Sequence, residues 1–341
     1  MTNGKKGKVG VQDIADILNI SASTVSRALN DHPRISKDTK DKVLQVARRL
    51  GYFSGMPDFT APERGEVIAL MVPSLEYAFY REVIYGARDY LEKKNYDISI
   101  FDTRKNDEYV SGLFGRYKNF GISGIIHVVS DRSIPADFYS GLIDDAMPVV
   151  SVFEAEYPSG ISSVLPDMFK GVYQSVKYLQ SIGVSRIALL LEHENCPVDH
   201  QIVSSFISAY ESVSGNAEDI SFFYTEMENK SIDRIVTEII GHDERPEVIF
   251  VKNVTSTFEV VSHLQREGID VPGDMMVITI DTVSGTKQLS GNMSLLKLPA
   301  YEMGYRAAEM LMAQIRNPKT DKKVSVIPAN FILKGSAMRI G

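Results

Sequence analysis

Hydrophobic residues in the first fifty positions recur at the three-to-four-residue spacing of amphipathic helices. Ile14 and Leu18 mark a first helix, and Ser21 is a good N-cap for a second helix that buries Val25. A loop follows, and the next apolar stripe predicts a third helix over 37–49. Two helices joined by a tight turn and braced by a third form a helix-turn-helix, whose second helix fits the major groove of DNA.

From position 66 onward the pattern changes to short apolar runs separated by amphipathic helices. The runs predict strands at 67–72, 97–101, 125–129 and 149–153, and then at 186–191, 220–225, 248–252 and 276–280. This alternation is typical of doubly wound α/β lobes with parallel sheets. Ligands of such lobes bind at the carboxyl ends of the strands. The predicted fold class is therefore a small all-α helix-turn-helix headpiece followed by an α/β core of two lobes.

Composition narrows the class of protein. The 341 residues are 44% hydrophobic and 24% charged, and no apolar run is long enough to span a membrane. Residues 1–8 include lysines with no apolar segment behind them, so we expect no secretory signal. The single cysteine, Cys196, excludes an intrachain disulfide and indicates a reducing cytoplasm. Zinc-ligand spacing is absent from the sequence, and we expect no cofactor and no metal.

Charge divides the chain into two parts of opposite sign. Residues 1–52 hold ten Lys or Arg and five Asp, a formal charge of +5, so the rest holds −12 of the total of −7. A basic segment on an acidic body is typical of a protein that binds DNA through one domain only.

The amino-acid identities in the first fifty-two residues are as specific as their hydrophobic pattern. The run Ser21-x-x-Thr24-Val25-Ser26-Arg27, followed by Gly51-Tyr52, resembles the headpiece of LacI/GalR-type bacterial repressors. Further family landmarks lie along the body, including Val-Pro-Ser at 72–74, Gly-Ile-Asp-Val-Pro-Gly-Asp at 268–274 and Met-Gly-Tyr-Arg-Ala-Ala-Glu-Met-Leu at 303–311. The resemblance thus covers nearly the whole chain.

The resemblance implies a domain organisation. It gives a DNA-binding headpiece at 8–52, a linker or hinge at 53–65 and a periplasmic-binding-protein-like core at 66–341 that binds an effector and dimerises. The N-terminal lobe would comprise about 66–160 and 293–322, and the C-terminal lobe about 161–292 and 323–341. It also implies a cytoplasmic homodimer that represses transcription from a near-palindromic operator and is switched by a small molecule in the cleft.

Candidate DNA contacts follow from the same resemblance. The two residues after the N-cap serine, Ala22 and Ser23, occupy base-reading positions, and Arg27 occupies a position from which it could pair bidentately with guanine. Hydroxyl and amide side chains suited to phosphate contacts are Thr24, Ser26, Asn30, Ser36 and Thr39. Helix capping is an equally weighted alternative for Ser26 and Thr39. Gln12 and Arg34 are additional candidates.

The linker departs from the family pattern. Family members fold this segment into a helix on DNA and insert a leucine into the minor groove. Here Ala61 stands at the leucine position, between Pro57 and Pro62. Four residues between two prolines cannot form a stable helix. We therefore favour a flexible tether, with Met56 or Phe59 as alternative wedges.

The cleft departs as well. Phe153, Ile202, Val254 and Leu298 stand where sugar-binding members carry polar side chains, whereas Asn253 and Asp281 remain. The loss of four polar groups would leave sugar hydroxyls unpaired, at about 1–3 kcal/mol each. We expect an effector that is not a free hexose. Aromatic candidates for stacking on it are Phe79, Tyr77, Tyr80 and Phe153, and packing of the cleft floor is the alternative role.

Three alternatives to an effector-controlled repressor stay open. A regulator with a degenerate cleft would bind DNA without an effector. A stand-alone small-molecule-binding protein would share the core fold, but the headpiece argues against it. An enzyme is the most distant alternative, because the sequence holds no nucleophile motif and no glycine-rich phosphate loop, and we assign no catalytic residue.

Overall fold

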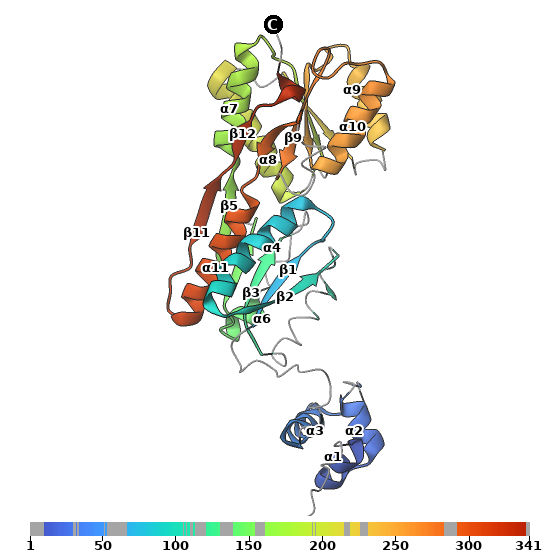
Figure 1. Ribbon diagram of the computed structural model, residues 1–341, viewed down its shortest axis with the longest axis vertical. Coiled ribbons are helices and arrows are strands. Elements are labelled where there is room, and N and C mark those ends of the chain that lie inside the picture. The colour runs from blue at the N-terminus through green and yellow to red at the C-terminus, as the bar shows by residue number, and fades with distance from the viewer. Residues whose placement is uncertain are drawn as a thin grey trace, which may run out of the picture. The chain divides into compact units, whose positions relative to one another are not determined.

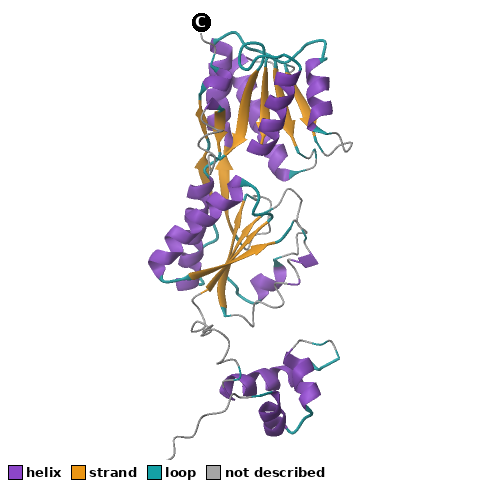
Figure 2. Cartoon of the chain, turned by 45° about the vertical axis from the view of Figure 1, so that its right-hand side comes forward, coloured by secondary structure: helices purple, strands orange, loops and turns teal. Residues whose placement is uncertain are grey.

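The computed structural model describes residues 10–29, 32, 34–50, 52, 67–104, 106, 108–109, 112, 121–129, 139–153, 161–192, 194, 196–214, 219–225, 231–282 and 292–338. The chain divides into two compact units, Met1–Pro62 and Glu63–Gly341. The first is all helical, and the second contains two sheets flanked by helices (Figures 1 and 2). The predictions for Asn30, for the linker at 53–65 and for its proline-bracketed segment lie outside the described residues.

The N-terminal unit contains the three predicted helices. They are α1 (Val11–Leu18), α2 (Ala22–Leu29) and α3 (Lys37–Leu50). Asn19 ends α1 in the left-handed conformation, with φ at 52°, which turns the chain sharply into α2. The three helices share one small core, whose buried members are Ile14, Ala15, Val25, Ala28, Val43 and Ala47.

The first sheet of the larger unit has six strands that are all parallel. Their order is β11-β5-β4-β3-β1-β2. The strands are β1 (Val67–Val72), β2 (Asp97–Asp102), β3 (Ile122–Val128), β4 (Val149–Val152), β5 (Ser162–Asp167) and β11 (Val324–Pro328). The central strands are apolar and buried along nearly their whole length, as expected for a parallel sheet covered on both faces.

The second sheet also has six strands, in the order β12-β10-β9-β8-β6-β7, and only the β10–β12 pair is antiparallel. The strands are β6 (Ile187–Leu191), β7 (Ile220–Tyr224), β8 (Val248–Lys252), β9 (Met276–Asp281), β10 (Ser294–Lys297) and β12 (Asn330–Ile332). The predicted fold class, a helical headpiece with two doubly wound lobes, is confirmed.

The lobe boundaries differ from those that the resemblance implied. The chain passes between the two sheets three times. Each passage follows a strand whose residues the expected boundaries assigned to the other lobe, because β5 and β11 belong to the first sheet and β10 belongs to the second. The boundaries expected at 160, 292 and 322 therefore move to the ends of these three strands. Each of these three strands is short and pairs in parallel with a strand of its own sheet. The sequence of a short strand does not indicate which of the two sheets it joins.

The helices cover both sheets. They are α4 (Ala78–Leu91), η1 (Glu92–Lys94), α6 (Ser140–Asp144), α7 (Met168–Ser181), α8 (Pro197–Ser214), α9 (Ile232–Ile240), α10 (Val254–Arg266), α11 (Ala300–Arg316) and η3 (Gly335–Ala337). Among the described residues, none of these helices has the length and apolar character needed to cross a membrane.

Helices α4 and α11 lie side by side along the first sheet (Figure 1) and approach closely at two glycines. A Cβ on Gly86 would lie 1.9 Å from the carbonyl oxygen of Tyr301, and one on Gly304 would lie 2.0 Å from that of Val83. Only glycine permits this backbone separation. The close approach fixes α4, whose first turn reaches the cavity described below.

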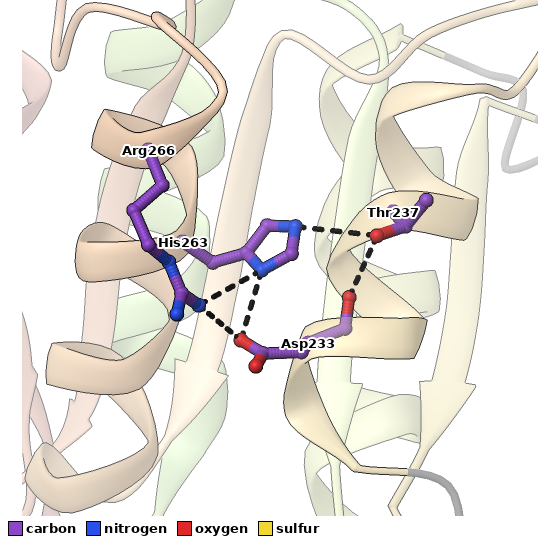
Figure 3. A network of polar contacts seen from close by, with 4 residues as sticks. All are labelled: Asp233, Thr237, His263 and Arg266. Atoms are coloured by element: carbon purple, nitrogen blue, oxygen red, sulfur yellow. Dashed lines mark hydrogen bonds and ion pairs between the residues drawn. The ribbon is translucent and has the colours of Figure 1, made fainter.

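A polar network joins α9 to α10 on the second lobe (Figure 3). Asp233 Oδ1 lies 2.8 Å from His263 Nδ1 and accepts from the Arg266 guanidinium at 2.6 Å. Thr237 Oγ1 lies 3.2 Å from His263 Nε2 and donates to the Asp233 carbonyl at 2.9 Å. The hydrogen bond from His263 holds the pKa of Asp233 below its ordinary value. The network fastens two helices to each other and does not line the cavity.

Candidate functional site

Helix α2 of the headpiece presents a polar surface that begins at a capped N-terminus. The Ser21 hydroxyl accepts from the Thr24 backbone N–H at 3.1 Å and lies 2.8 Å from the hydroxyls of both Ser23 and Thr24. Ser23, Ser26 and Arg27 are exposed on the helix, and Ala22 is half-buried. The cap leaves the first turn with ordered hydroxyl groups and Arg27 free to extend from the last turn.

The start of α3 is capped in the same way. Ser36 Oγ accepts from the Thr39 backbone N–H at 3.3 Å and lies 2.7 Å from Thr39 Oγ1. Ser36 is therefore the capping residue of α3, and Thr39 supplies the backbone N–H that Ser36 accepts and a hydroxyl that contacts it. Gln12 donates to Asp16 at 2.8 Å on α1, and the Arg34 backbone N–H donates to His32 Nδ1 at 3.2 Å. Capping does not exclude phosphate contact, because a capped helix N-terminus still carries backbone donors that attract anions.

The larger unit contains a cavity that is lined by residues from both of its sheets and their helices. All six candidate effector residues line it: Phe79, Phe153, Ile202, Asn253, Asp281 and Leu298. The remaining lining residues are Tyr77, Tyr80, Val129, Glu192, Val198, Lys252 and Ile280. Most of these residues lie at or just beyond the carboxyl ends of β3, β4, β6, β8, β9 and β10, which is where α/β sheets place their ligands. Val254 is not among them.

One wall of the cavity is aromatic and comes from the first lobe. The rings of Phe79 and Phe153 meet edge to face with centroids 5.3 Å apart, and Phe79 meets Tyr80 in the same way at 5.6 Å. Tyr77 packs edge to face on Tyr80 at 6.0 Å. The chain bends into this wall with strain, since Phe153 has a φ of +79°. Four aromatic rings in mutual contact form a continuous apolar surface.

The opposite wall comes from the second lobe and combines the apolar side chains of Val198, Ile202, Ile280 and Leu298 with four polar ones. We call these four, Glu192, Lys252, Asn253 and Asp281, the polar wall. The two predicted polar side chains, Asn253 and Asp281, are already hydrogen-bonded. Asp281 accepts from the backbone N–H groups of Val254 at 2.9 Å and Thr282 at 2.6 Å. Asn253 Oδ1 accepts from the Ser256 N–H at 2.8 Å and caps α10, with a strained φ of +65°. Both residues hold the start of α10 in place, so they position this wall as well as line it.

Burial affects the protonation of Asp281. Its carboxyl group is 5% exposed, and burial raises its pKa to about 6. The charge of Glu192 acts in the same direction, whereas the two backbone hydrogen bonds and the charge of Arg81 oppose it. Asp281 is consequently ionised at neutral pH and becomes neutral in mildly acidic solution.

The sequence analysis did not predict a cluster of charged residues in this wall. Lys252 Nζ lies 2.7 Å from Asp199 Oδ1 and 3.2 Å from Glu192 Oε2, and Asn253 Nδ2 donates to Glu192 Oε1 at 2.8 Å. Glu192 directly follows β6, and Lys252 is the last residue of β8. A signal was present in the sequence, because charged residues stood at the ends of two adjacent buried strands.

The described residues, those of the cavity included, hold no group of three or more His, Cys, Asp or Glu side chains placed to bind a metal ion. Cys196 is buried at the start of α8.

Comparisons with known proteins match a different family model to each unit. Residues 10–54 match the family model described as bacterial regulatory proteins, lacI family, and residues 176–337 match that of a periplasmic binding protein-like domain. Similar curated proteins include the NTD biosynthesis operon regulator NtdR of Bacillus subtilis (strain 168), 24% identical over 332 residues that cover 96% of this chain and 99% of NtdR. Catabolite control protein A of Priestia megaterium is 23% identical and covers 94% of this chain and 96% of its own.

Solved structures agree on the fold. A LacI family transcriptional regulator from Enterococcus faecium with bound ribose superposes with a TM-score of 0.70 at 20% identity, over 81% of this chain and 100% of that chain. The complex of the transcriptional regulator CelR with cellobiose gives a TM-score of 0.67 at 17% identity, over 96% of this chain and 99% of that chain.

Proposed function

Because this chain belongs to the LacI family of bacterial regulatory proteins, we propose that it is a transcriptional repressor. Its affinity for its operator is switched by a small molecule that binds in the cavity. The observation that carries the proposal is the combination of a capped DNA-binding helix with a cavity lined from both sheets of the core. Its relatives by name are regulators, and we assign it no catalytic role.

The DNA contacts are assigned by position on the headpiece. Arg27 carries the base reading that a guanidinium makes with guanine, and Ala22 and Ser23 lie against neighbouring base edges. The capped starts of α2 and α3, with Thr24, Ser36 and Thr39, face phosphates and fix the register of the headpiece without reading sequence. Ser26, Asn30, Gln12 and Arg34 add further contacts. Since the target is chromosomal DNA, the protein acts in the cytoplasm.

The switch follows from the construction of the cavity. A ligand that touches the aromatic wall of one lobe and the polar wall of the other stabilises one relative orientation of the two lobes. The effector is not a free hexose, because Phe153, Ile202 and Leu298 offer no partner to sugar hydroxyls. Phe79 and Phe153 offer aromatic contact to such a ligand.

The regulator works as a homodimer, since a near-palindromic operator requires two headpieces. Exposed apolar side chains on neighbouring elements of the first lobe support this. Leu75 precedes α4, Tyr85 lies on α4, and Ile100 lies on the edge strand β2. An unpaired edge strand with an exposed isoleucine is a surface that a second copy can cover.

A second candidate is a regulator whose cleft binds no effector. It is favoured by the internal hydrogen bonds of Asn253 and Asp281, which leave both side chains satisfied without a ligand.

One experiment tests the proposal and separates the candidates. The full chain is used to select bound fragments from the source genome, and the affinity for the recovered fragment is measured with and without a panel of metabolites. The proposal expects a near-palindromic motif and a change in affinity of ten-fold or more with one compound. A motif that no compound affects would favour the second candidate, and recovery of no specific fragment would overturn both.

A further inference from the structure

The charges that line the cavity are unbalanced. In the part of the chain that the structure describes, two carboxyl groups, Glu192 and Asp281, and one ammonium group, Lys252, line the cavity. The buried carboxylate of Asp199 does not line it but lies 2.7 Å from Lys252 and compensates that charge. We infer that the effector is an organic amine, an inference that rests on the proposed function. Such a ligand has an apolar, preferably aromatic body and a cationic head that donates hydrogen bonds.

Glu192 is the group that meets the head. It lines the cavity, and its side chain is 16% exposed. Oε1 accepts from Asn253 and Oε2 faces Lys252, an arrangement that fixes the orientation of the carboxylate. Each carboxylate oxygen carries a second lone pair, so Glu192 can still accept from a ligand N–H group.

Lys252 does not convert the wall into an anion site. Its ammonium group lies between two carboxylates, 2.7 Å from that of Asp199 and 3.2 Å from that of Glu192. Its positive charge is therefore compensated within the protein. A phosphate or carboxylate placed beside it would also lie close to Glu192, and like charges repel strongly where water is excluded.

The other charged groups near this wall do not reverse the balance. Asp281 lines the cavity beside Glu192 and adds acceptor capacity. Arg81 on α4 acts on Asp281 from a distance, but its guanidinium donates to the carbonyls of Leu75 at 3.1 Å and Glu76 at 2.6 Å and does not line the cavity. A cationic head completes the charge balance that the protein leaves open.

The aromatic wall accommodates the same ligand class. Phe79, Phe153, Tyr77 and Tyr80 line the same cavity as Glu192 and Asp281. Their rings offer stacking to an aromatic body, and the negative faces of such rings attract a cation. An anionic ligand is not attracted by the ring faces, and its charge is repelled by Glu192. The apolar lining by itself would not exclude a phosphorylated metabolite as the effector. The carboxylates of Glu192 and Asp281 exclude it, because they repel its phosphate group.

The test compares ligands that differ only in the charge of the head. Tryptamine and indole-3-propionate share an indole and a two-carbon chain, and 2-phenylethylamine and 3-phenylpropionate form a second pair. Kd values for the full chain are measured by calorimetry at neutral pH, with D-glucose and D-ribose 5-phosphate as sugar probes. We expect at least one amine to bind ten-fold or more tightly than its carboxylate partner and than both sugars.

Two variants locate the preference. Glu192→Gln removes the charge of the contacting carboxylate while preserving its shape and should reduce the amine-to-carboxylate ratio of affinities at least five-fold. Glu194→Gln removes the same charge from an exposed neighbour that does not line the cavity and should leave the ratio unchanged.

The inference would be overturned by carboxylates or the sugar phosphate binding as tightly as the amines, by no binding of either amine, or by an unchanged ratio in Glu192→Gln. Tight binding of glucose would overturn it while leaving the cavity as an effector site. The proposed function fails separately, if amines bind as expected but operator affinity does not respond to them.

Discussion

At the scale of single residues, two buried ionisable groups in the core respond to acid in opposite ways. His127 on β3 contacts the Tyr139 hydroxyl and is 4% exposed, and burial lowers its pKa to about 4. The pKa of Asp281 is instead raised to about 6. Folding therefore opposes protonation of His127 and opposes ionisation of Asp281. In the whole protein the two contributions partly cancel between pH 4 and 6.

The His127 contribution is isolated by comparing the wild type with His127→Asn. The unfolded chain binds a proton at this residue near pH 6.5, and the folded chain does so only near pH 4. The stability contributed by His127 is thus lost as pH falls from about 6.5 to 4, by about 3 kcal/mol at most. Urea unfolding at a series of pH values should show the wild type losing stability relative to the variant across this window. A difference that is constant with pH would contradict the assignment.

The residues of the cavity show how far the sequence alone reaches. The six candidates converge in the structure because each follows a strand or lies in a helix whose position the family resemblance fixes. The charged cluster of Glu192, Asp199 and Lys252 was not predicted, since it depends on the register of β6 beside β8 and on the placement of α8. The internal bonding of Asp281 was also hidden, because a sequence does not distinguish a ligand-binding carboxylate from one that accepts backbone N–H groups.

At the scale of elements, the contact between α4 and α11 should be the least tolerant of added volume. Gly304→Ala would place a methyl group 2.0 Å from a backbone carbonyl, and overpacking of this kind destabilises by about 1–3 kcal/mol. Gly141→Ala is the matched control, because a Cβ there meets nothing within 4 Å. Thermal unfolding should show a clearly lower Tm for the first variant only, and equal Tm values would contradict the close approach.

The elements also show where pattern reading fails. Long periodic helices and buried central strands were predicted in the right places, because burial imposes the periodicity. The passages between sheets were placed one strand early, because the short segments that form β5, β10 and β11 were not among the predicted strands. Sheet order depends on pairing between segments far apart in the chain.

The linker carries a prediction that rests on sequence, since residues 53–66 lie outside those described. With prolines at 57 and 62 and no leucine between them, the two headpieces should act as modules on flexible tethers. Insertion of one base pair at the operator centre should then change Kd by less than ten-fold in a fluorescence anisotropy titration. A loss of a hundred-fold or more would show that the linker orders on DNA.

At the scale of the whole molecule, dimerisation through the first lobe is a testable requirement of operator binding. Ile100→Asp introduces a charge on the exposed edge of β2 and should shift the protein toward monomer in sedimentation experiments. Ile143→Asp, at a comparably exposed isoleucine on α6, is the control. An unaffected dimer in Ile100→Asp would move the interface elsewhere.

The proposed function depends most on sequence-specific recognition of the operator by α2. The direct measurement is a titration of the selected operator, and of its single-base-pair substitutions, with the wild type, Arg27→Ala and Arg27→Lys. We predict that Arg27→Ala weakens binding to the best half-site by about 1–3 kcal/mol and loses discrimination at one base pair, whereas Arg27→Lys restores charge but not the full preference. Unchanged affinity and unchanged base preference in Arg27→Ala would contradict the assignment of this helix as the reader of the operator.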